Sequence, residues 1–114
     1  MAETKYAVVE GLKCNDPRML KKMTLAEARI RACAMARRHK GERIGIFVED
    51  KYHISAGHYM PKLIEDVTYW FNERLITGDV LDGYYLIQWT SNRHYRVSPK
   101  TGKLLDISKD FKYL

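Results

Sequence analysis

The stretch PKLIEDVTYWFNERL, residues 61–75, carries the clearest periodic signal in the chain. Its apolar residues recur at helical spacing and would share one broad face of a helix: Leu63, Ile64, Val67, Trp70, Phe71 and Leu75. Pro61 suits the first turn of a helix, where a missing amide hydrogen costs nothing, and Gly78 suits the position after its end. The stretch therefore predicts an amphipathic helix, with Glu65 and Asn72 facing water.

A second helix is predicted upstream of this stretch. Thr24 and Glu27 have the spacing of a capping box, in which each side chain bonds the other residue's backbone amide. Leu25, Ala28, Ala32, Met35 and Ala36 then fall on one stripe, and Gly41 ends the pattern. Because this inward stripe is mostly alanine, the helix can lie close to a sheet.

Short β-branched and aromatic runs predict six strands, over residues 5–11, 43–49, 52–59, 83–90, 94–98 and 104–107. Asp50 and Lys51 are expected to form the turn that joins the second and third of these strands in a hairpin. Ser91 and Asn92 begin the turn between the fourth and fifth strands, so the last three strands should form a meander.

The predicted order is β-α-β-β-α-β-β-β, an α+β fold with two helices packed on one face of a mainly antiparallel sheet. Its first six elements match the order of the ferredoxin-like plait. With 114 residues the chain fits one domain, residues 1–114, and the basic, aromatic residues 108–114 would form a tail that docks or frays.

Composition limits the setting in which the protein acts. The N-terminus has no apolar leader, and no window approaches the roughly 18 consecutive apolar residues of a membrane span, so we expect a cytoplasmic protein without membrane contact. Cys14 and Cys33 lack metal-site or redox-motif spacing and are expected to be free thiols.

The charge is segregated along the chain. Residues 1–40 carry a formal charge of +6, residues 41–90 of −4 and residues 91–114 of +4. If the two basic ends met on one face, they would form a dipolar surface that could steer a charged partner.

No catalytic or metal-binding pattern stands out. His53 and His58 would point to opposite faces of a strand and so could not share a metal ion, and no phosphate-binding glycine loop is present. Adjacent carboxylates such as Glu65 and Asp66 occupy solvated positions in the predicted helix, where nothing would raise their pKa for acid–base work. We therefore expect a non-enzymatic protein with no metal and no cofactor.

The segment WTSNRHYRVSPKTGK, residues 89–103, is the strongest candidate binding region. Its cations would lie along a two-turn ribbon, spaced to meet successive phosphates, with Tyr95 available to stack on a base. The competing interpretation is a solvated hairpin, in which Tyr95 and Val97 belong to the core and the cations protect an edge strand. The candidate residues are Arg93, His94, Tyr95, Arg96, Lys100 and Lys103, joined by Arg31 and Arg38 if the first helix lies adjacent.

These observations favour function by contact. We expect a small accessory protein that acts through protein–protein contact, because its compactness and lack of catalytic groups resemble those of proteins that phages and mobile elements use to modulate a host protein or nucleoprotein complex. The alternative is a nucleic-acid-binding module that uses the basic C-terminal hairpin. Self-association through an exposed strand is a third way for the chain to act by contact.

Overall fold

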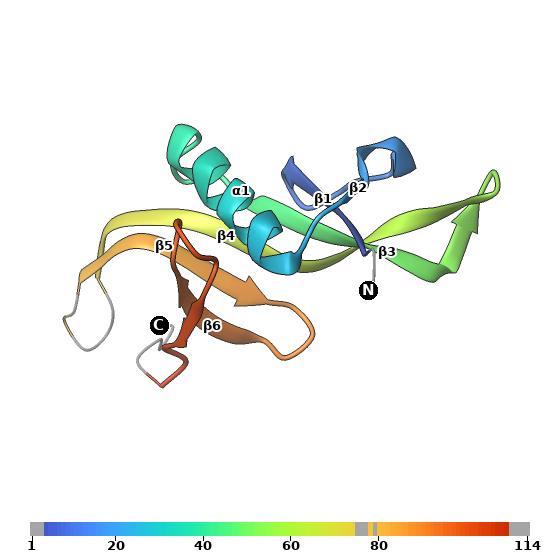
Figure 1. The fold of residues 1–114 in the computed structure, drawn as a ribbon. Coiled ribbons are helices and arrows are strands. Elements are labelled where there is room, and N and C mark those ends of the chain that lie inside the picture. The colour runs from blue at the N-terminus through green and yellow to red at the C-terminus, as the bar shows by residue number, and fades with distance from the viewer. Residues whose placement is uncertain (1–3, 75–77, 79, 110–114) are drawn as a thin grey trace.

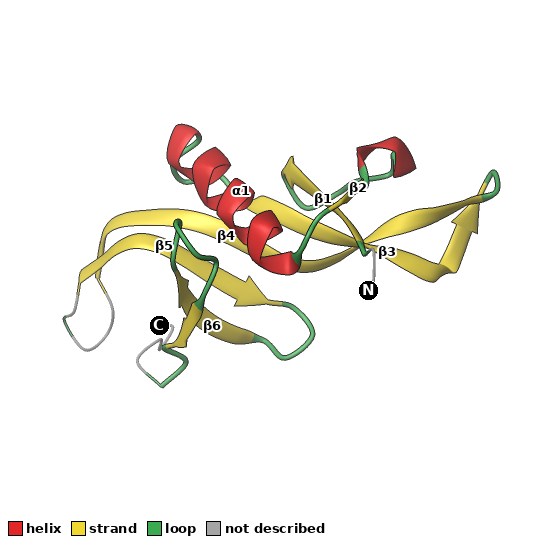
Figure 2. Ribbon diagram, in the orientation of Figure 1, coloured by secondary structure: helices red, strands yellow, loops and turns green. Residues whose placement is uncertain are grey.

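The computed structural model describes residues 4–74, 78 and 80–109. Its elements are β1 (Lys5–Glu10), a 3₁₀ helix η1 (Pro17–Met19), β2 (Lys21–Lys22), α1 (Leu25–Arg38), β3 (Ile44–Ser55), β4 (His58–Arg74), β5 (Val80–Gln88), β6 (Arg93–Val97) and β7 (Leu104–Asp106). The described part of the chain is therefore mostly β, with one α-helix (Figure 2).

The seven strands form one sheet in the order β2-β1-β3-β4-β5-β6-β7, with every neighbouring pair antiparallel. The sheet curls into a half barrel, and α1 lies across β1, β3 and β4 on one side of it (Figure 1). At the far end of the curl, the turn between β6 and β7 touches the first turn of α1. A Cβ atom added at Gly102 in that turn would lie 2.6 Å from the carbonyl oxygen of Ala26.

The predicted upstream helix is confirmed as α1. The Thr24 hydroxyl accepts a hydrogen bond from the backbone amide of Glu27 at 3.1 Å, which is one of the two bonds of the capping box, and it also donates to Oε1 of Glu27 at 3.3 Å. Ala28, Ala32 and Ala36 are fully buried, and their small side chains let the helix approach the sheet closely.

The core has one main layer between α1 and the sheet. The sheet contributes the buried residues Ile44, Ile46, Val67, Leu86 and Val97 to it. Side chains alternate along a strand, so the neighbours of these residues point to the other face. There Ala7 and Phe47 pack with Leu20 in a smaller cluster under the segment that contains η1.

The second predicted helix is wrong, because its residues form the central strand β4. Two irregularities in the pairing of β4 account for the helical spacing of its apolar residues. Glu65 pairs with Ile46 but Leu63 pairs with Phe47, so Ile64 is an extra residue in the strand. A second shift follows Trp70. Bulges of this kind break the alternation of period two, and the resulting pattern imitates a helix.

The predicted α+β class, with two helices on one face of the sheet, is therefore wrong, and so is the ferredoxin-like plait. Glu65 was expected in water, yet it is 1% exposed and pairs with Arg29 of α1. A helix would have placed Glu65 on a solvated face, whereas the β4 strand directs it toward α1. The predicted C-terminal meander is present as β5, β6 and β7.

The predicted turn at Asp50 is also wrong. β3 continues to Ser55, and the chain reverses at Ala56 and Gly57, which have φ angles of 53° and 80°. Positive φ at both central residues is typical of a two-residue type I′ hairpin turn.

The hairpin formed by β3 and β4 extends past the neighbouring strands β1 and β5. β1 pairs with β3 only as far as Val48, and the pairing of β5 with β4 begins at Glu65. We call residues 49–62, which run beyond both neighbours, the arm (Figure 1).

Two further expectations concern the ends and the surroundings of the chain. In the predicted tail, residues 110–114 lie outside the described part of the chain. Within the described part, no helix combines the length and apolar character that crossing a membrane requires.

Candidate binding surfaces

The predicted C-terminal ribbon uses its two arginines within the fold. Arg93 lies 3.6 Å from the Asp106 carboxylate on the neighbouring strand β7. Arg96 lies over the ring of Tyr85, 5.6 Å from the centroid, and donates a hydrogen bond to its hydroxyl at 3.0 Å. Both guanidinium groups therefore have partners inside the sheet, which favours the interpretation of a solvated hairpin for β6.

The other predicted residues of this segment divide between the interior and the turn. His94 is buried, and burial lowers the pKa of its imidazole from the ordinary value. Tyr95 is half-buried and packs against the main core cluster, as the interpretation of a solvated hairpin expects. Lys100 and Lys103 are exposed in and after the β6–β7 turn, where the described residues give their side chains no ion pair.

Arg31 and Arg38 lie on another surface. Both are exposed on α1, and they line a groove with Lys21 of β2 that contains none of the predicted hairpin residues. The structure therefore brings these two arginines together but does not join them to the ribbon.

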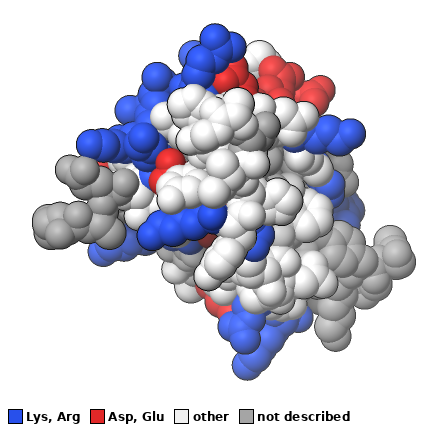
Figure 3. Space-filling view, turned by 90° about the vertical axis from the view of Figure 1, so that its right-hand side faces the viewer, with Lys and Arg blue, Asp and Glu red and all other residues white. Residues whose placement is uncertain are grey.

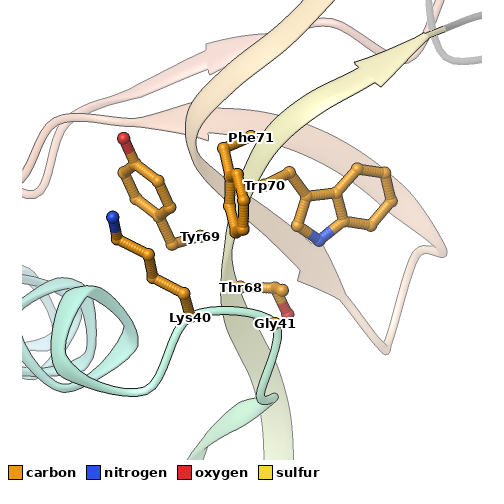
Figure 4. Close-up of a pocket in the computed structure, with 6 residues that line it drawn as sticks. All are labelled: Lys40, Gly41, Thr68, Tyr69, Trp70 and Phe71. Carbon is orange, nitrogen blue, oxygen red and sulfur yellow. The ribbon is translucent and has the colours of Figure 1, made fainter.

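A hollow of about 390 Å³ lies at the C-terminal end of α1, and the sequence did not indicate it. Its lining residues are Lys40, Gly41, Thr68, Tyr69, Trp70 and Phe71 (Figure 4). The ammonium group of Lys40 lies 5.5 Å from the ring centroid of Tyr69 and 5.4 Å from that of Phe71. Tyr69 also meets Tyr84 edge to face at 5.0 Å. Both rings already interact with the ammonium group of Lys40. The hollow is therefore lined by an aromatic and cationic cluster at one end of the half barrel.

Asp66 is a buried carboxylate on the face of the sheet opposite α1. Arg43 lies 3.6 Å from Oδ2, and the Trp89 side chain approaches the carboxylate as a further donor. Burial raises the pKa of Asp66 to about 6, although the positive charge of Arg43 acts in the opposite direction. Asp66 is therefore a buried carboxyl group with a raised pKa, at a position that the predicted helix would have exposed to solvent.

No family model, curated protein or solved structure matches this chain. Its function must therefore be argued from its surfaces. Within residues 4–74, 78 and 80–109, histidine, cysteine and carboxylate side chains form no cluster of three that could hold a metal ion.

The arm carries three exposed large apolar side chains, among them Tyr52, which is the most exposed of those in the described part of the chain. Tyr52 is 96% exposed and Ile54 62% exposed, and Tyr59, directly opposite Ile54 in the register, is 40% exposed. Tyr52 lies in a bulge, since Asp50 pairs with Met60 while Ile54 pairs with Tyr59. Its backbone amide donates to Oδ1 of Asp50 at 3.0 Å, which fixes the shape of this bulge.

The arm also lengthens the molecule. The molecule measures 50 × 26 × 26 Å, with the arm at one end of the sheet (Figure 1). Viewed from that end, an area without Lys, Arg, Asp or Glu runs through the middle of the surface, with basic side chains on both sides of it and acidic ones at its upper edge (Figure 3). Sequence reasoning missed this surface because it placed the turn at Asp50. The pair Ala56-Gly57 was the signal that could have found it.

Proposed function

We propose that the protein is a non-enzymatic accessory binding protein whose arm docks on a partner protein. The observation that carries the proposal is the exposure of Tyr52 and Ile54 on a projecting two-stranded ribbon. Exposed aromatic and aliphatic side chains on a free ribbon gain most from a partner that covers them.

The backbone of the arm supports the same conclusion. Among the described residues, no strand pairs with the outer edges of the arm beyond Val48 on β3 and before Glu65 on β4. Open edges of this kind pair with an extended segment of another polypeptide, which supplies backbone hydrogen bonds, while side-chain pockets give specificity.

The charge of the arm favours protein over nucleic acid. Residues 49–62 contain two acidic residues, Glu49 and Asp50, and two lysines, Lys51 and Lys62. Binding to the phosphate backbone depends on an excess of cations, and the arm has none.

Photo-crosslinking tests the proposal. A photoreactive phenylalanine analogue placed at position 52 should crosslink to one defined protein in a lysate of the source organism. The same analogue at position 100, on the exposed β6–β7 turn, serves as the matched control. The double variant Tyr52→Ser/Ile54→Ser should lose that partner in a pull-down. Its free energy of unfolding should nevertheless lie within about 0.5 kcal/mol of that of the original chain, because both side chains are exposed. Retention of the partner by this variant would overturn the proposal.

The alternative function, nucleic-acid binding through the C-terminal hairpin, keeps support from Lys100 and Lys103, which are exposed in one turn. Binding of a single-stranded oligonucleotide should then weaken linearly in log affinity against log salt, with a slope near −0.7 for each phosphate contact. The variant Lys100→Ala/Lys103→Ala should flatten that slope. An unchanged slope would remove the hairpin as the contact.

A further inference from the structure

A groove of about 310 Å³ runs between α1 and the β1–β2 edge of the sheet, on a different surface from the arm. It is lined by Val8, Lys21, Met23, Arg31, Ala34, Met35 and Arg38. Three of these residues are cations, none is acidic, and the other four are apolar.

The helix side of the groove is a regular stripe. Arg31, Ala34, Met35 and Arg38 occur at positions i, i+3, i+4 and i+7, so they share one face of α1. At a rise of 1.5 Å per residue, the two arginines stand roughly 10 Å apart along the helix, with the small and apolar residues between them. Lys21 adds a third cation from the strand side.

The other two cations of α1 have partners within the fold. Arg29 pairs with Glu65, and Arg37 lies 5.6 Å from the centroid of the Tyr69 ring. By contrast, the described part of the chain offers no acidic partner to Lys21, Arg31 or Arg38. The groove therefore holds three uncompensated positive charges.

The apolar lining favours a peptide over a nucleic acid. Met23 and Met35 are partly buried, and flexible thioether side chains adapt to the apolar side chains of a bound segment. No aromatic ring lines the groove, so it lacks the stacking platform that single-stranded nucleic acids use.

We propose that this groove binds an acidic, amphipathic segment of a partner protein. Two carboxylates of the segment would meet Arg31 and Arg38, and an apolar side chain between them would lie on Met35. A separation of roughly 10 Å corresponds to positions i and i+7 on a helix, which share one face. The inference is independent of the arm and goes beyond its proposed partner.

The test uses a fluorescent helical peptide of about 14 residues, with two Glu residues at i and i+7 and two Leu residues between them. Anisotropy at about 50 mM salt, where surface charges are weakly screened, should show saturable binding to the full chain. The same peptide with Gln in place of Glu should bind about tenfold more weakly, since it cannot form the two ion pairs.

Matched variants locate the site. Arg31→Ala/Arg38→Ala should weaken binding of the Glu peptide about tenfold, whereas Lys100→Ala/Lys103→Ala, which removes the same charge elsewhere, should leave it within about twofold. Equal loss in both variants, equal binding of the Gln peptide, or no binding of the Glu peptide would overturn the proposal. A single-stranded oligonucleotide that displaces the peptide and depends on Arg31 and Arg38 would also overturn it.

A further variant separates this test from that of the arm. Tyr52→Ser/Ile54→Ser should bind the Glu peptide as the original chain does, because its substitutions lie outside the groove. The proposal for the groove and the proposal for the arm can therefore be refuted independently.

Discussion

Arg29 of α1 and Glu65 of β4 form an ion pair with two hydrogen bonds, 2.9 Å from Nε to Oε1 and 2.6 Å from Nη2 to Oε2. The side chains are 13% and 2% exposed. The pair joins the one α-helix of the described residues to the central strand of the sheet, in a layer that is otherwise apolar.

Glu65→Leu should destabilise the protein by about 3–5 kcal/mol, because it leaves the Arg29 guanidinium buried without its counter-charge. The double variant Arg29→Met/Glu65→Leu should recover most of that loss, since it removes both charges. Arg93→Met is the exposed control, because Arg93 and Asp106 are 59% and 46% exposed, and it should cost less than about 1 kcal/mol. Urea denaturation measures all three, and a loss in Glu65→Leu no larger than that in Arg93→Met would contradict the role of the pair.

Asp66 should make stability depend on pH in the weakly acidic range. Its pKa in the folded state is raised to about 6, so the protonated carboxyl group stabilises the fold relative to the ionised one. The stability from protonation is fully present below the ordinary aspartate pKa and is lost as pH rises through about 6. Asp66→Asn should remove this dependence, so that its free energy of unfolding relative to the original chain should be up to about 3 kcal/mol more favourable at neutral pH than at pH 4. Parallel stability curves for the two proteins between pH 4 and 7 would rule this out.

Gly102 should tolerate no side chain. Its φ angle is 70°, and an added Cβ would approach the carbonyl oxygen of Ala26 at 2.6 Å and its Cα at 2.9 Å. Gly41 is the matched control, since its φ angle is 86° but an added Cβ would meet nothing within 4 Å. Gly41→Ala should cost about 1 kcal/mol in backbone strain, and Gly102→Ala should cost about 1–3 kcal/mol more through the clash. Thermal unfolding compares the two, and equal losses would mean that the β6–β7 turn moves freely away from α1.

The two thiols should differ in reactivity. Cys33 is fully buried against the sheet, and burial raises the pKa of its thiol to about 12, whereas Cys14 is partly exposed. A thiol reagent at about pH 8 should therefore modify one equivalent quickly in the native protein and the second only on unfolding. Cys14→Ser should abolish the fast phase. Rapid modification of both thiols in the native state would show that α1 separates readily from the sheet.

The sequence predicted the elements whose signals are local. The Thr24 capping box and the alanine stripe that follows identified α1, and the turn residues Ser91 and Asn92 identified the β5–β6 connection. The second helix failed because β4 is covered on both faces, by α1 on one and by the Leu20 and Phe47 cluster on the other. A strand with two apolar faces and two bulges has no alternation to recognise.

The candidate sites show the same limit. Sequence reasoning proposed Arg93 and Arg96 because cations repeat along one segment, but it could not place Asp106 and Tyr85 beside them, since strand order decides those contacts. Arg31 and Arg38 share one exposed face of α1, because their spacing of seven residues on a helix fixes that common face. The groove they line required Lys21, which reaches it only through the pairing of β2 with β1.

The contact between Ala26 and Gly102 has a kinetic consequence. These residues lie far apart in the chain, so bringing them together has a large cost in loop-closure entropy. That cost is offset only when all the strands between them have paired to form the curled sheet. The layer of α1 against β1, β3 and β4 involves shorter separations and can assemble first. We expect the β6–β7 turn to close last during folding, so that a weakened turn would accelerate unfolding while leaving the folding rate almost unchanged.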